Sequence, residues 1–315
     1  MKHFTSLTDI DNATALVIEA IALKKAKEKT LLGKNKTIGL LFFNSSLRTR
    51  MSTQKAAQNL GMDVMFLNVN NDSWALEFEE GAIMNGKTVE HIKDAAGVMG
   101  LYCDILAIRC FPSLEKKEED YAENIINQFI KYAKVPIVSL ESATRHPLQS
   151  LADMITIQEH KKKDNPKIVL SWAPHIKPIP QVVANSFAEW TLASGFDLTI
   201  THPEGYALST EFTKGATIEY NQEKALQDAD FVYVKNWCSF TNYGKVLPVD
   251  EDWMLTNEKL QVTNDAKVMH CLPVRRNIEL SDEVLDSENS LILHQAENRI
   301  HAAQIVLKKI LETNF

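Results

Sequence analysis

Two arginines and several hydroxyl side chains occur together directly after an apolar, strand-like run. The run covers residues 37–43, and the string Ser45-Ser46-Leu47-Arg48-Thr49-Arg50 follows it and opens a helix-like stretch that reaches Leu60. A helix that begins here presents unpaired backbone N–H groups and the positive end of its dipole. Arg48 and Arg50 add forked donors, each worth roughly 1.5–3 kcal/mol to an ionised partner. The string therefore predicts an anion-binding site; the alternative is an N-capping serine with two solvated arginines.

Two further strings place histidines after strand-like runs. His146-Pro147-Leu148-Gln149 follows the apolar run 135–140, and His270-Cys271-Leu272-Pro273 follows 266–269. A neutral imidazole or a glutamine carboxamide at such a place can donate to a carbonyl oxygen. Each string has an ordinary alternative, because a histidine or cysteine at a strand end is commonly a packing residue.

The elements that must position these strings alternate along the chain. Short apolar, β-branched runs alternate with longer stretches of helical period, and the runs occupy residues 38–43, 64–67, 105–108, 168–172, 198–200 and 231–234. This alternation predicts an α/β fold with parallel sheets and helices on both faces. A length of 315 residues favours two domains. Ligands of such sheets bind beyond the carboxyl ends of the strands, where all three strings lie.

Composition narrows the class of protein. There are 34 basic and 41 acidic residues, for a net charge of −7, and no long basic block, so we expect no nucleic-acid partner. The N-terminus has no apolar signal core and no run approaches the ~18 residues that span a bilayer, so we expect a cytoplasmic protein without a membrane partner. The four cysteines form no Cys-x-x-Cys pair, which argues against structural zinc and disulfides. Three of them are interpreted as packing residues and Cys271 as a candidate for chemistry.

Taken together and in this order, the three strings resemble the carbamoyltransferase superfamily over nearly the whole chain. Its N-acylornithine branch is the most similar part. The resemblance implies two domains, residues 1–147 for carbamoyl phosphate and 148–293 for the acylornithine, each a parallel sheet flanked by helices. It also implies that a C-terminal helix, 294–315, packs back on the first domain, and that the Pro-rich segment 173–180 closes a deep knot in the second. The strings that carry it are Phe43-Asn44-Ser45-Ser46-Leu47-Arg48-Thr49-Arg50, Ala143-Thr144-Arg145-His146-Pro147-Leu148-Gln149-Ser150, Trp172-Ala173-Pro174-His175 and Thr201-His202-Pro203-Glu204-Gly205-Tyr206.

The same resemblance implies a site for carbamoyl phosphate. Catalytic roles fall to Arg109, His146, Gln149 and Cys271, with the carbonyl of Leu272 helping Cys271 to orient the attacking amine. No metal, cofactor or covalent intermediate is implied, although a thiol could also act as a nucleophile. Without the resemblance, Arg109 would be a strand-end surface charge. Trp74 would reach the site of a neighbouring subunit in a homotrimer, or else cover its own subunit. The implied carbamoyl phosphate ligands are Ser46, Leu47, Arg48, Thr49, Arg50, Trp74, Arg109, His146, Gln149, Cys271, Leu272 and Arg299.

The second substrate is expected to be an ornithine whose α-nitrogen is acylated. Lys235 would repel a free α-ammonium but suits carboxylates. In the family that the chain resembles, the acyl group is recognised just before a Glu-His pair, here Glu90-His91, where acetyl-type enzymes have glutamate and succinyl-type enzymes have proline. Val89 matches neither, but it brings no anion against a succinyl carboxylate, so succinyl is favoured over acetyl. The further candidates around the acylornithine are Glu141, His175 and Arg276, with Arg275 as an alternative to Arg276; Glu279 has no assigned role.

The implied reaction transfers the carbamoyl group to the δ-amine of N-succinyl-L-ornithine, giving N-succinyl-L-citrulline and phosphate in arginine biosynthesis. N-acetylornithine or plain ornithine is the alternative acceptor. A non-catalytic anion-binding regulator is the alternative from another class, and it is disfavoured because a protein that only binds has no need for the carbonyl donors His146 and Gln149.

Overall fold

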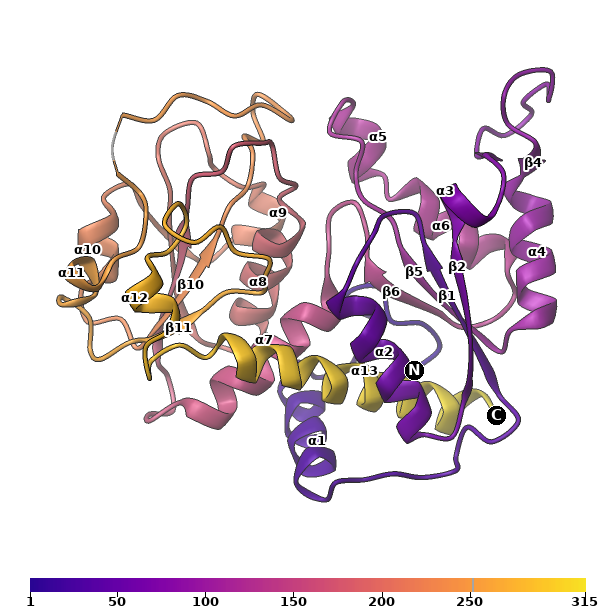
Figure 1. Ribbon diagram of the computed structural model, residues 1–315, viewed down its shortest axis with the longest axis horizontal. Helices are drawn as coiled ribbons and strands as arrows, with labels where there is room; N and C mark the ends of the chain where they lie inside the picture. Colours follow the sequence, from indigo (N-terminus) through magenta and orange to yellow (C-terminus); the bar gives the residue numbers. More distant parts are fainter. Residues whose placement is uncertain (251) are drawn as a thin grey trace. The chain divides into compact units, whose positions relative to one another are not determined.

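The computed structural model describes residues 1–250 and 252–315 and divides into two compact units (Figure 1). The first comprises Met1–Leu148 with Arg299–Phe315, and the second comprises Gln149–Asn298. Helices α7 (Pro147–His160) and α13 (Ile292–Asn314) each have residues in both units. No helix in the described ranges is long and apolar enough to cross a membrane.

The first unit is built on a four-stranded parallel sheet of order β2-β1-β5-β6. Helices α4 and α6 cover one face, and Figure 1 shows α1, α2 and the end of α13 on the other. The remaining elements are short, and β3 pairs with β4 in a separate two-stranded sheet. The elements are η1 (Leu7–Asp9), α1 (Ala13–Lys25), β1 (Thr37–Phe42), α2 (Arg48–Asn59), β2 (Asp63–Asn68), α3 (Val69–Asp72), β3 (Leu76–Glu77), β4 (Glu90–His91), α4 (Ile92–Tyr102), β5 (Ile105–Arg109), α5 (Lys117–Tyr121), α6 (Asn124–Tyr132) and β6 (Ile137–Glu141).

The second unit is built on a five-stranded parallel sheet of order β11-β10-β7-β8-β9. Helices α10 and α12 pack with Val232 and Val234 on one face of this sheet. On the other face, the ring of Phe187 in α8 contacts the ring of Tyr233, with 4.2 Å between the ring centroids. This follows from the alternation of side chains along β10. The elements besides α7 and α13 are β7 (Lys167–Trp172), α8 (Val182–Ala193), β8 (Asp197–Thr201), α9 (Thr210–Thr213), β9 (Thr217–Glu219), α10 (Gln222–Leu226), β10 (Phe231–Lys235), α11 (Asn257–Leu260), β11 (Lys267–Met269) and α12 (Asp282–Leu285).

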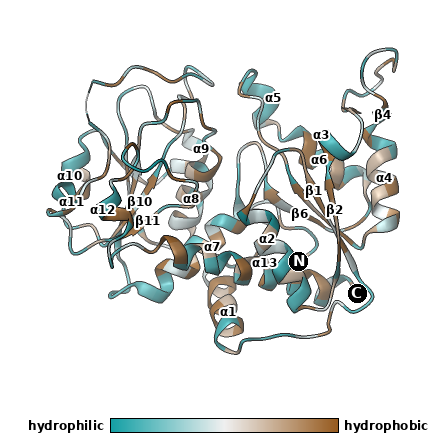
Figure 2. Cartoon of the chain, viewed as in Figure 1, coloured by the Kyte–Doolittle hydropathy of each residue, from teal (hydrophilic) through white to brown (hydrophobic). Residues whose placement is uncertain are grey.

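The core strands are apolar because helices cover them on both sides. Strands β1, β5, β6, β7 and β10 are buried along nearly their whole length, and Figure 2 shows the region of β1 in the first sheet largely in the brown of hydrophobic residues. The predicted α/β fold of two domains with parallel sheets flanked by helices is confirmed, and so are the predicted strand runs. The short strand β9 and the pair β3–β4 were not predicted, because runs of two or three residues carry no readable period.

Helix α13 ties the end of the chain to its beginning within the first unit. Gln304 accepts a hydrogen bond from Asn59 of α2 at 2.9 Å and donates to the carbonyl of Glu28 at 2.7 Å. Lys308 pairs with the Glu28 carboxylate at 2.7 Å. These contacts fix the helix that carries Arg299.

Candidate active site

The anion-binding string of the first unit lies at a reversal of strand order. The chain runs from β1 outward to β2 and then returns to the other side of β1 as β5. Loops after β1 and β5 therefore diverge, and open α/β sheets bind ligands beyond the carboxyl ends of strands at such a reversal. Thr49, in the first turn of α2, and Arg109, the last residue of β5, both lie there.

The Thr49 hydroxyl joins two buried guanidinium groups. Its Oγ1 accepts hydrogen bonds from Arg109 Nη1 at 3.3 Å and from Arg299 Nη2 at 2.6 Å. Thr49 is only 2% exposed, and both arginines are buried. A hydroxyl has two acceptor lone pairs and one proton, so these bonds use both lone pairs and leave the proton to donate. Two positive charges and a donor hydroxyl thus converge on one place, which is the chemistry that a phosphate requires.

Glu141 and His146 extend this group of residues. The Glu141 carboxylate accepts a hydrogen bond from Arg109 and lies 3.4 Å from His146 Nε2. Burial, with the positive charges of Arg299, Arg109 and Arg48, lowers the pKa of His146 well below its usual value. The negative charge of Glu141, which forms an ion pair with Arg109, does not reverse this shift. His146 is therefore a neutral imidazole at pH 7.

His146 Nδ1 and Arg109 Nε are both buried and have no hydrogen-bond partner among the described residues. A buried polar atom left without a partner costs about 1–3 kcal/mol, and such atoms are rare in folded proteins. Arg109 Nε can only donate, and His146 Nδ1 donates in the tautomer that carries the ring proton there, so a ligand with oxygen acceptors would satisfy both. The first unit therefore has the features of a site for an oxygen-bearing anion.

The rest of the predicted phosphate loop is placed unequally. The Ser46 hydroxyl accepts from the backbone N–H of Thr49 at 3.3 Å, and Leu47 is the N-cap of α2 with an exposed side chain, so its backbone is the part suited to a ligand. Arg48 is half-buried. Arg50 is exposed and lies over the ring of Phe66 in β2, 3.4 Å from the ring centroid. It is therefore not part of the Thr49 group, by which we mean Thr49, Arg109, Glu141, His146 and Arg299.

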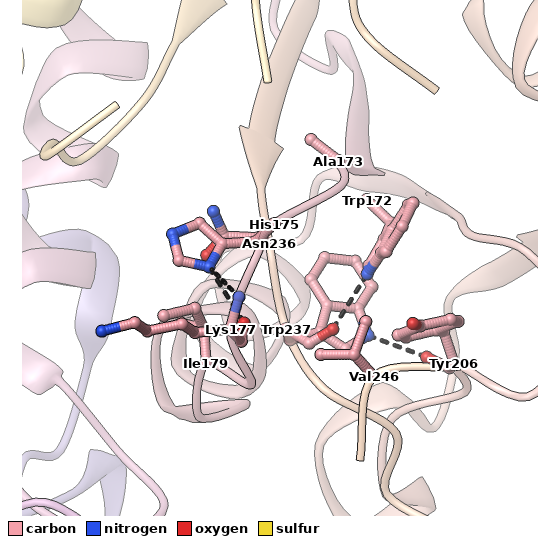
Figure 3. Close-up of a pocket in the computed structure, with 9 residues that line it drawn as sticks. All are labelled: Trp172, Ala173, His175, Lys177, Ile179, Tyr206, Asn236, Trp237 and Val246. Atoms are coloured by element: carbon pink, nitrogen blue, oxygen red, sulfur yellow. Dashed lines mark hydrogen bonds between the residues drawn. The ribbon is translucent and has the colours of Figure 1, made fainter. Parts of the chain in front are cut away.

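The second unit has its own reversal of strand order, between β7 and β10, and a pocket lies there. It holds about 170 Å³ of empty space. Figure 3 shows its aromatic side, Trp172, Trp237 and Tyr206, held by hydrogen bonds from Trp172 Nε1 to the Trp237 carbonyl and from Trp237 Nε1 to the Tyr206 carbonyl. The complete lining is Trp172, Ala173, His175, Lys177, Ile179, Tyr206, Asn236, Trp237 and Val246.

Cationic and imidazole groups occur around this pocket. His175 lies in its wall and accepts a hydrogen bond from Arg275 Nε at 3.0 Å. Lys235, at the end of β10, is buried and donates to Asn236 Oδ1 at 2.7 Å. Arg276, predicted to bind the acylornithine, instead forms exposed ion pairs with Asp282 and Asp286, both at 2.7 Å. Because those carboxylates occupy its guanidinium group, Arg275 replaces Arg276 as the candidate.

The turn after β11 is held by a buried carboxylate. Glu279 Oε2 lies 2.8 Å from His270 Nε2, and His270 Nδ1 accepts from the backbone N–H of Leu272 at 3.0 Å. Nδ1 therefore carries no proton and Nε2 donates to Glu279. Burial opposes ionisation of Glu279, but the hydrogen bond from His270 and the charge of Lys235 hold the pKa of the carboxyl below its usual value. Leu272 adopts φ +58°, and the buried Cys271 precedes it.

Sequence reasoning assigned no role to the buried carboxyl group of Asp153. Asp153 of α7 accepts a hydrogen bond from Gln149 Nε2 at 2.7 Å and another from Gln295 Nε2 at 2.9 Å. A readable signal existed, because a charged residue one helical turn after Gln149 interrupts an otherwise apolar stretch.

Trp74 and Val89 lie on an exposed loop of the first unit. Their exposed fractions are 54% and 64%. The Trp74 indole donates to Glu90 Oε2 at 2.7 Å, and the Val89 N–H bonds to the Ala75 carbonyl at 2.9 Å. Both residues are therefore fixed beside the β3–β4 pair with their side chains toward solvent.

Comparison with known families finds two models that together match most of the chain. Residues 2–159 match the carbamoyl-P binding domain of aspartate/ornithine carbamoyltransferase, and residues 180–310 match the Asp/Orn binding domain. The chain belongs to the aspartate/ornithine carbamoyltransferase family. This confirms the membership that the three strings predicted.

Individual members of this family are similar over nearly their full length. The N-succinylornithine carbamoyltransferase of Bacteroides thetaiotaomicron is 51% identical over 315 residues, with 99% of each chain covered. The N-acetylornithine carbamoyltransferase of Xanthomonas axonopodis pv. citri is 33% identical over 330 residues, covering 98% of this chain and 96% of that one. A solved N-acetyl-L-ornithine transcarbamylase with one glutamate replaced by valine, in complex with carbamyl phosphate and N-succinyl-L-norvaline, superposes with a TM-score of 0.91 at 32% identity, covering 98% and 100% of the two chains.

Proposed function

We propose that this protein transfers the carbamoyl group of carbamoyl phosphate to the δ-amine of N-succinyl-L-ornithine, giving N-succinyl-L-citrulline and phosphate. The observation that carries this proposal is the convergence of Arg109 and Arg299 on the Thr49 hydroxyl beside a neutral His146. The full-length likeness to an N-succinylornithine carbamoyltransferase supports the choice of acceptor.

The donor substrate fits the charge of the first unit. The phosphate oxygens would accept hydrogen bonds from the Thr49 hydroxyl, from the guanidinium groups of Arg48, Arg109 and Arg299, and from the backbone N–H groups at the start of α2. His146, being neutral, has one ring N–H to offer to the carbamoyl carbonyl. Negative charge develops on that oxygen during the reaction, so donors fixed in a buried site lower the barrier, and one of them is worth about 3 kcal/mol. Arg50 serves β2 through Phe66 and contributes only long-range charge.

The chemical step needs only groups that the two substrates and this chain supply. The δ-nitrogen attacks the carbamoyl carbon, a C–N bond forms, the C–O bond to phosphate breaks, and the departing phosphate accepts the amine proton. Cys271 and the Leu272 carbonyl orient the amine. Burial of Cys271 suits a group that packs beside a substrate more than it suits an attacking thiolate.

The acceptor substrate would bind in the second unit, at the pocket of Figure 3. His175 lines this pocket, Arg275 bonds to His175, and Lys235 bonds to the lining residue Asn236. These groups suit the α-carboxylate and the acyl group, and the charge of Lys235 opposes a free α-ammonium. Glu141, bonded to Arg109, would be placed to accept from a substrate N–H as well as to balance charge.

Succinyl is favoured over acetyl at Val89. A relative whose glutamate is replaced by valine was solved with N-succinyl-L-norvaline, so a valine at the corresponding position is compatible with a succinyl group. N-acetylornithine remains the second candidate, since acetyl-specific relatives are 33% identical.

We also propose a homotrimer in which Trp74 and Val89 of one subunit complete the site of the next. Apolar side chains on the exposed surface of the first unit support this, because such groups are usually covered in an assembly. They include Ile83, Leu101 and Tyr102, together with Trp74 and Val89. Arginine biosynthesis and the cytoplasm, the pathway and compartment of the family, are carried over as part of the proposal.

A deep knot in the second unit is proposed on the path of the Pro-rich segment. Residues 173–181, between β7 and α8, form no helix, and this segment is hydrogen-bonded to residues much later in the sequence. The Ile179 carbonyl accepts from Cys238 N at 2.7 Å, and His175 accepts from Arg275. Pulling the chain from its two ends in an optical trap should leave a contour length shorter than that of 315 extended residues, and full extension would refute the knot.

One assay tests the function. Purified protein is incubated with carbamoyl phosphate and, separately, N-succinylornithine, N-acetylornithine or ornithine, and the ureido product is measured. We expect turnover with N-succinylornithine at the highest kcat/KM. A higher value with N-acetylornithine would reverse the assignment of the acyl group, and no product with any acceptor would refute the function. His175→Ala should raise KM for the acylornithine far more than KM for carbamoyl phosphate.

A further inference from the structure

We propose that Asp153 is a positioning residue that holds both the Gln149 carboxamide and the turn containing Cys271 and Leu272 in their reactive arrangement. This inference rests on the proposed carbamoyl transfer. Asp153 is wholly buried and lies four residues after Gln149, so the two side chains share one face of α7.

Two carboxamides converge on a single carboxylate oxygen. Asp153 Oδ1 accepts from Gln149 Nε2 at 2.7 Å and from Gln295 Nε2 at 2.9 Å. Both hydrogen bonds are donated by an NH2 group to the same carboxyl oxygen, so each carboxamide is held with its NH2 group toward Asp153. The end of Gln149 that carries its oxygen is thereby fixed in direction. An amide that could rotate freely would present donor and acceptor in alternation to a substrate.

The second arm reaches the turn after β11. Gln295, oriented by Asp153, accepts the backbone N–H of His270 on its own Oε1 at 2.8 Å. His270 in turn accepts the Leu272 N–H on Nδ1 and donates from Nε2 to Glu279. Leu272 has a left-handed backbone, a conformation that is strained for such a residue and persists only when its surroundings hold it. Asp153 therefore connects the His-Pro-x-Gln string to the His-Cys-Leu-Pro string.

A carboxylate in this place has a cost that a merely structural role does not require. Burying a charge is expensive unless it is hydrogen-bonded, and an apolar residue of similar size often stabilises such a position better. The orientation that Asp153 imposes on both carboxamides explains a buried acidic group at the junction of the two strings.

The experiment compares Asp153→Asn and Asp153→Leu with a matched control, Thr156→Val. Thr156 is also wholly buried in α7, and its hydroxyl accepts from Asn298 Nδ2 at 3.0 Å, so the control removes a buried hydrogen bond that does not reach Gln149 or Gln295. We expect kcat to fall about tenfold in Asp153→Asn, which keeps an acceptor oxygen, and about 100-fold in Asp153→Leu, by analogy with the loss of an oxyanion donor. Thr156→Val should lower Tm but change kcat less than about twofold.

A double-mutant cycle shows whether Asp153 acts through Gln149. In the Gln149→Ala background, Asp153→Asn should have a clearly smaller effect on kcat than in the wild type, because the group that it positions is already absent. Full additivity, or a fall in Tm with kcat preserved in both Asp153 variants, would overturn the inference.

An outcome without enzyme activity is also informative. If the wild type transfers no carbamoyl group, the proposed function fails, and the inference is tested by crystal structures of the wild type and Asp153→Asn. A rotated Gln149 carboxamide and a displaced Leu272 backbone would support the orienting role, and unchanged positions of both would refute it.

Discussion

Replacing Thr49 by valine tests the phosphate site with the smallest change of shape. Valine has the same branching as threonine, so the buried packing of Thr49 is kept and only the hydroxyl is lost. The hydroxyl accepts from Arg109 and Arg299 and keeps its proton for the ligand. The variant therefore removes a donor to the phosphate and also the acceptor that holds two guanidinium groups together.

The magnitude follows from these contacts. A hydrogen bond to a charged group contributes about 1.5–3 kcal/mol, so loss of the Thr49 donor alone should weaken carbamoyl phosphate binding by about 10- to 150-fold. Separation of Arg109 and Arg299, which repel each other without their common acceptor, moves the result toward the upper end of this range. Stability should fall less, because both arginines can bind water when no ligand is present.

Calorimetric titration with carbamoyl phosphate, or with phosphonoacetamide as a stable analogue, measures this loss directly. Thr49→Ser is the matched control, because it restores the hydroxyl with one methyl group fewer, and it should bind within about fivefold of the wild type. Binding by Thr49→Val within twofold of the wild type, in a protein with a normal far-UV CD spectrum, would refute the assignment of the Thr49 group as the phosphate site.

Three further predictions concern other parts of the site. Because the pKa of His146 is lowered in the folded protein, the unfolded chain takes up a proton near pH 6.5 and the folded protein does not. The free energy of unfolding should therefore decline below that pH by up to about 1.4 kcal/mol per pH unit. Urea unfolding at pH 7.5, 6.5 and 5.5 should show a shallower decline in His146→Gln, and equal slopes would contradict the neutral imidazole. Val89→Glu should lower kcat/KM for N-succinylornithine at least tenfold and spare N-acetylornithine, because it sets an anion against the succinyl carboxylate; parallel losses for both would place residue 89 outside the acyl site. Trp74→Ala and Arg48→Ala are each expected to be inactive alone, but a mixture whose subunits are dissociated and reassociated together should regain part of the activity. Proven exchange of subunits without recovery of activity would show that each site is self-contained.

Much of this protein was readable from local sequence. The strands are apolar and β-branched because helices cover both faces, so their positions were predicted closely, as at β1, β7 and β10. The strings after strands were readable for a related reason. A parallel α/β chain places its ligands beyond the carboxyl ends of its strands, so polar residues that follow a strand mark a candidate site before any contact is known.

Residues that reach a site from distant elements could not be read in this way. Arg299 bonds to Thr49 across 250 positions of sequence, and nothing around it in α13 distinguishes it from a surface arginine. Arg275 and Arg276 are adjacent, and only the position of Asp282 and Asp286 decides which of them is held in ion pairs.

The sequence by itself determined the family, the α/β class and the chemical types of the site residues, because those depend on residue identity, hydrophobic period and the order of three short strings. The tertiary structure decided which of those side chains meet. It joined Thr49 to two guanidinium groups, directed Arg50 to Phe66, and placed Asp153 where two carboxamides need one acceptor. Such choices depend on strand order and on the direction in which each helix presents its side chains, and both are set by packing among segments that are far apart in the chain.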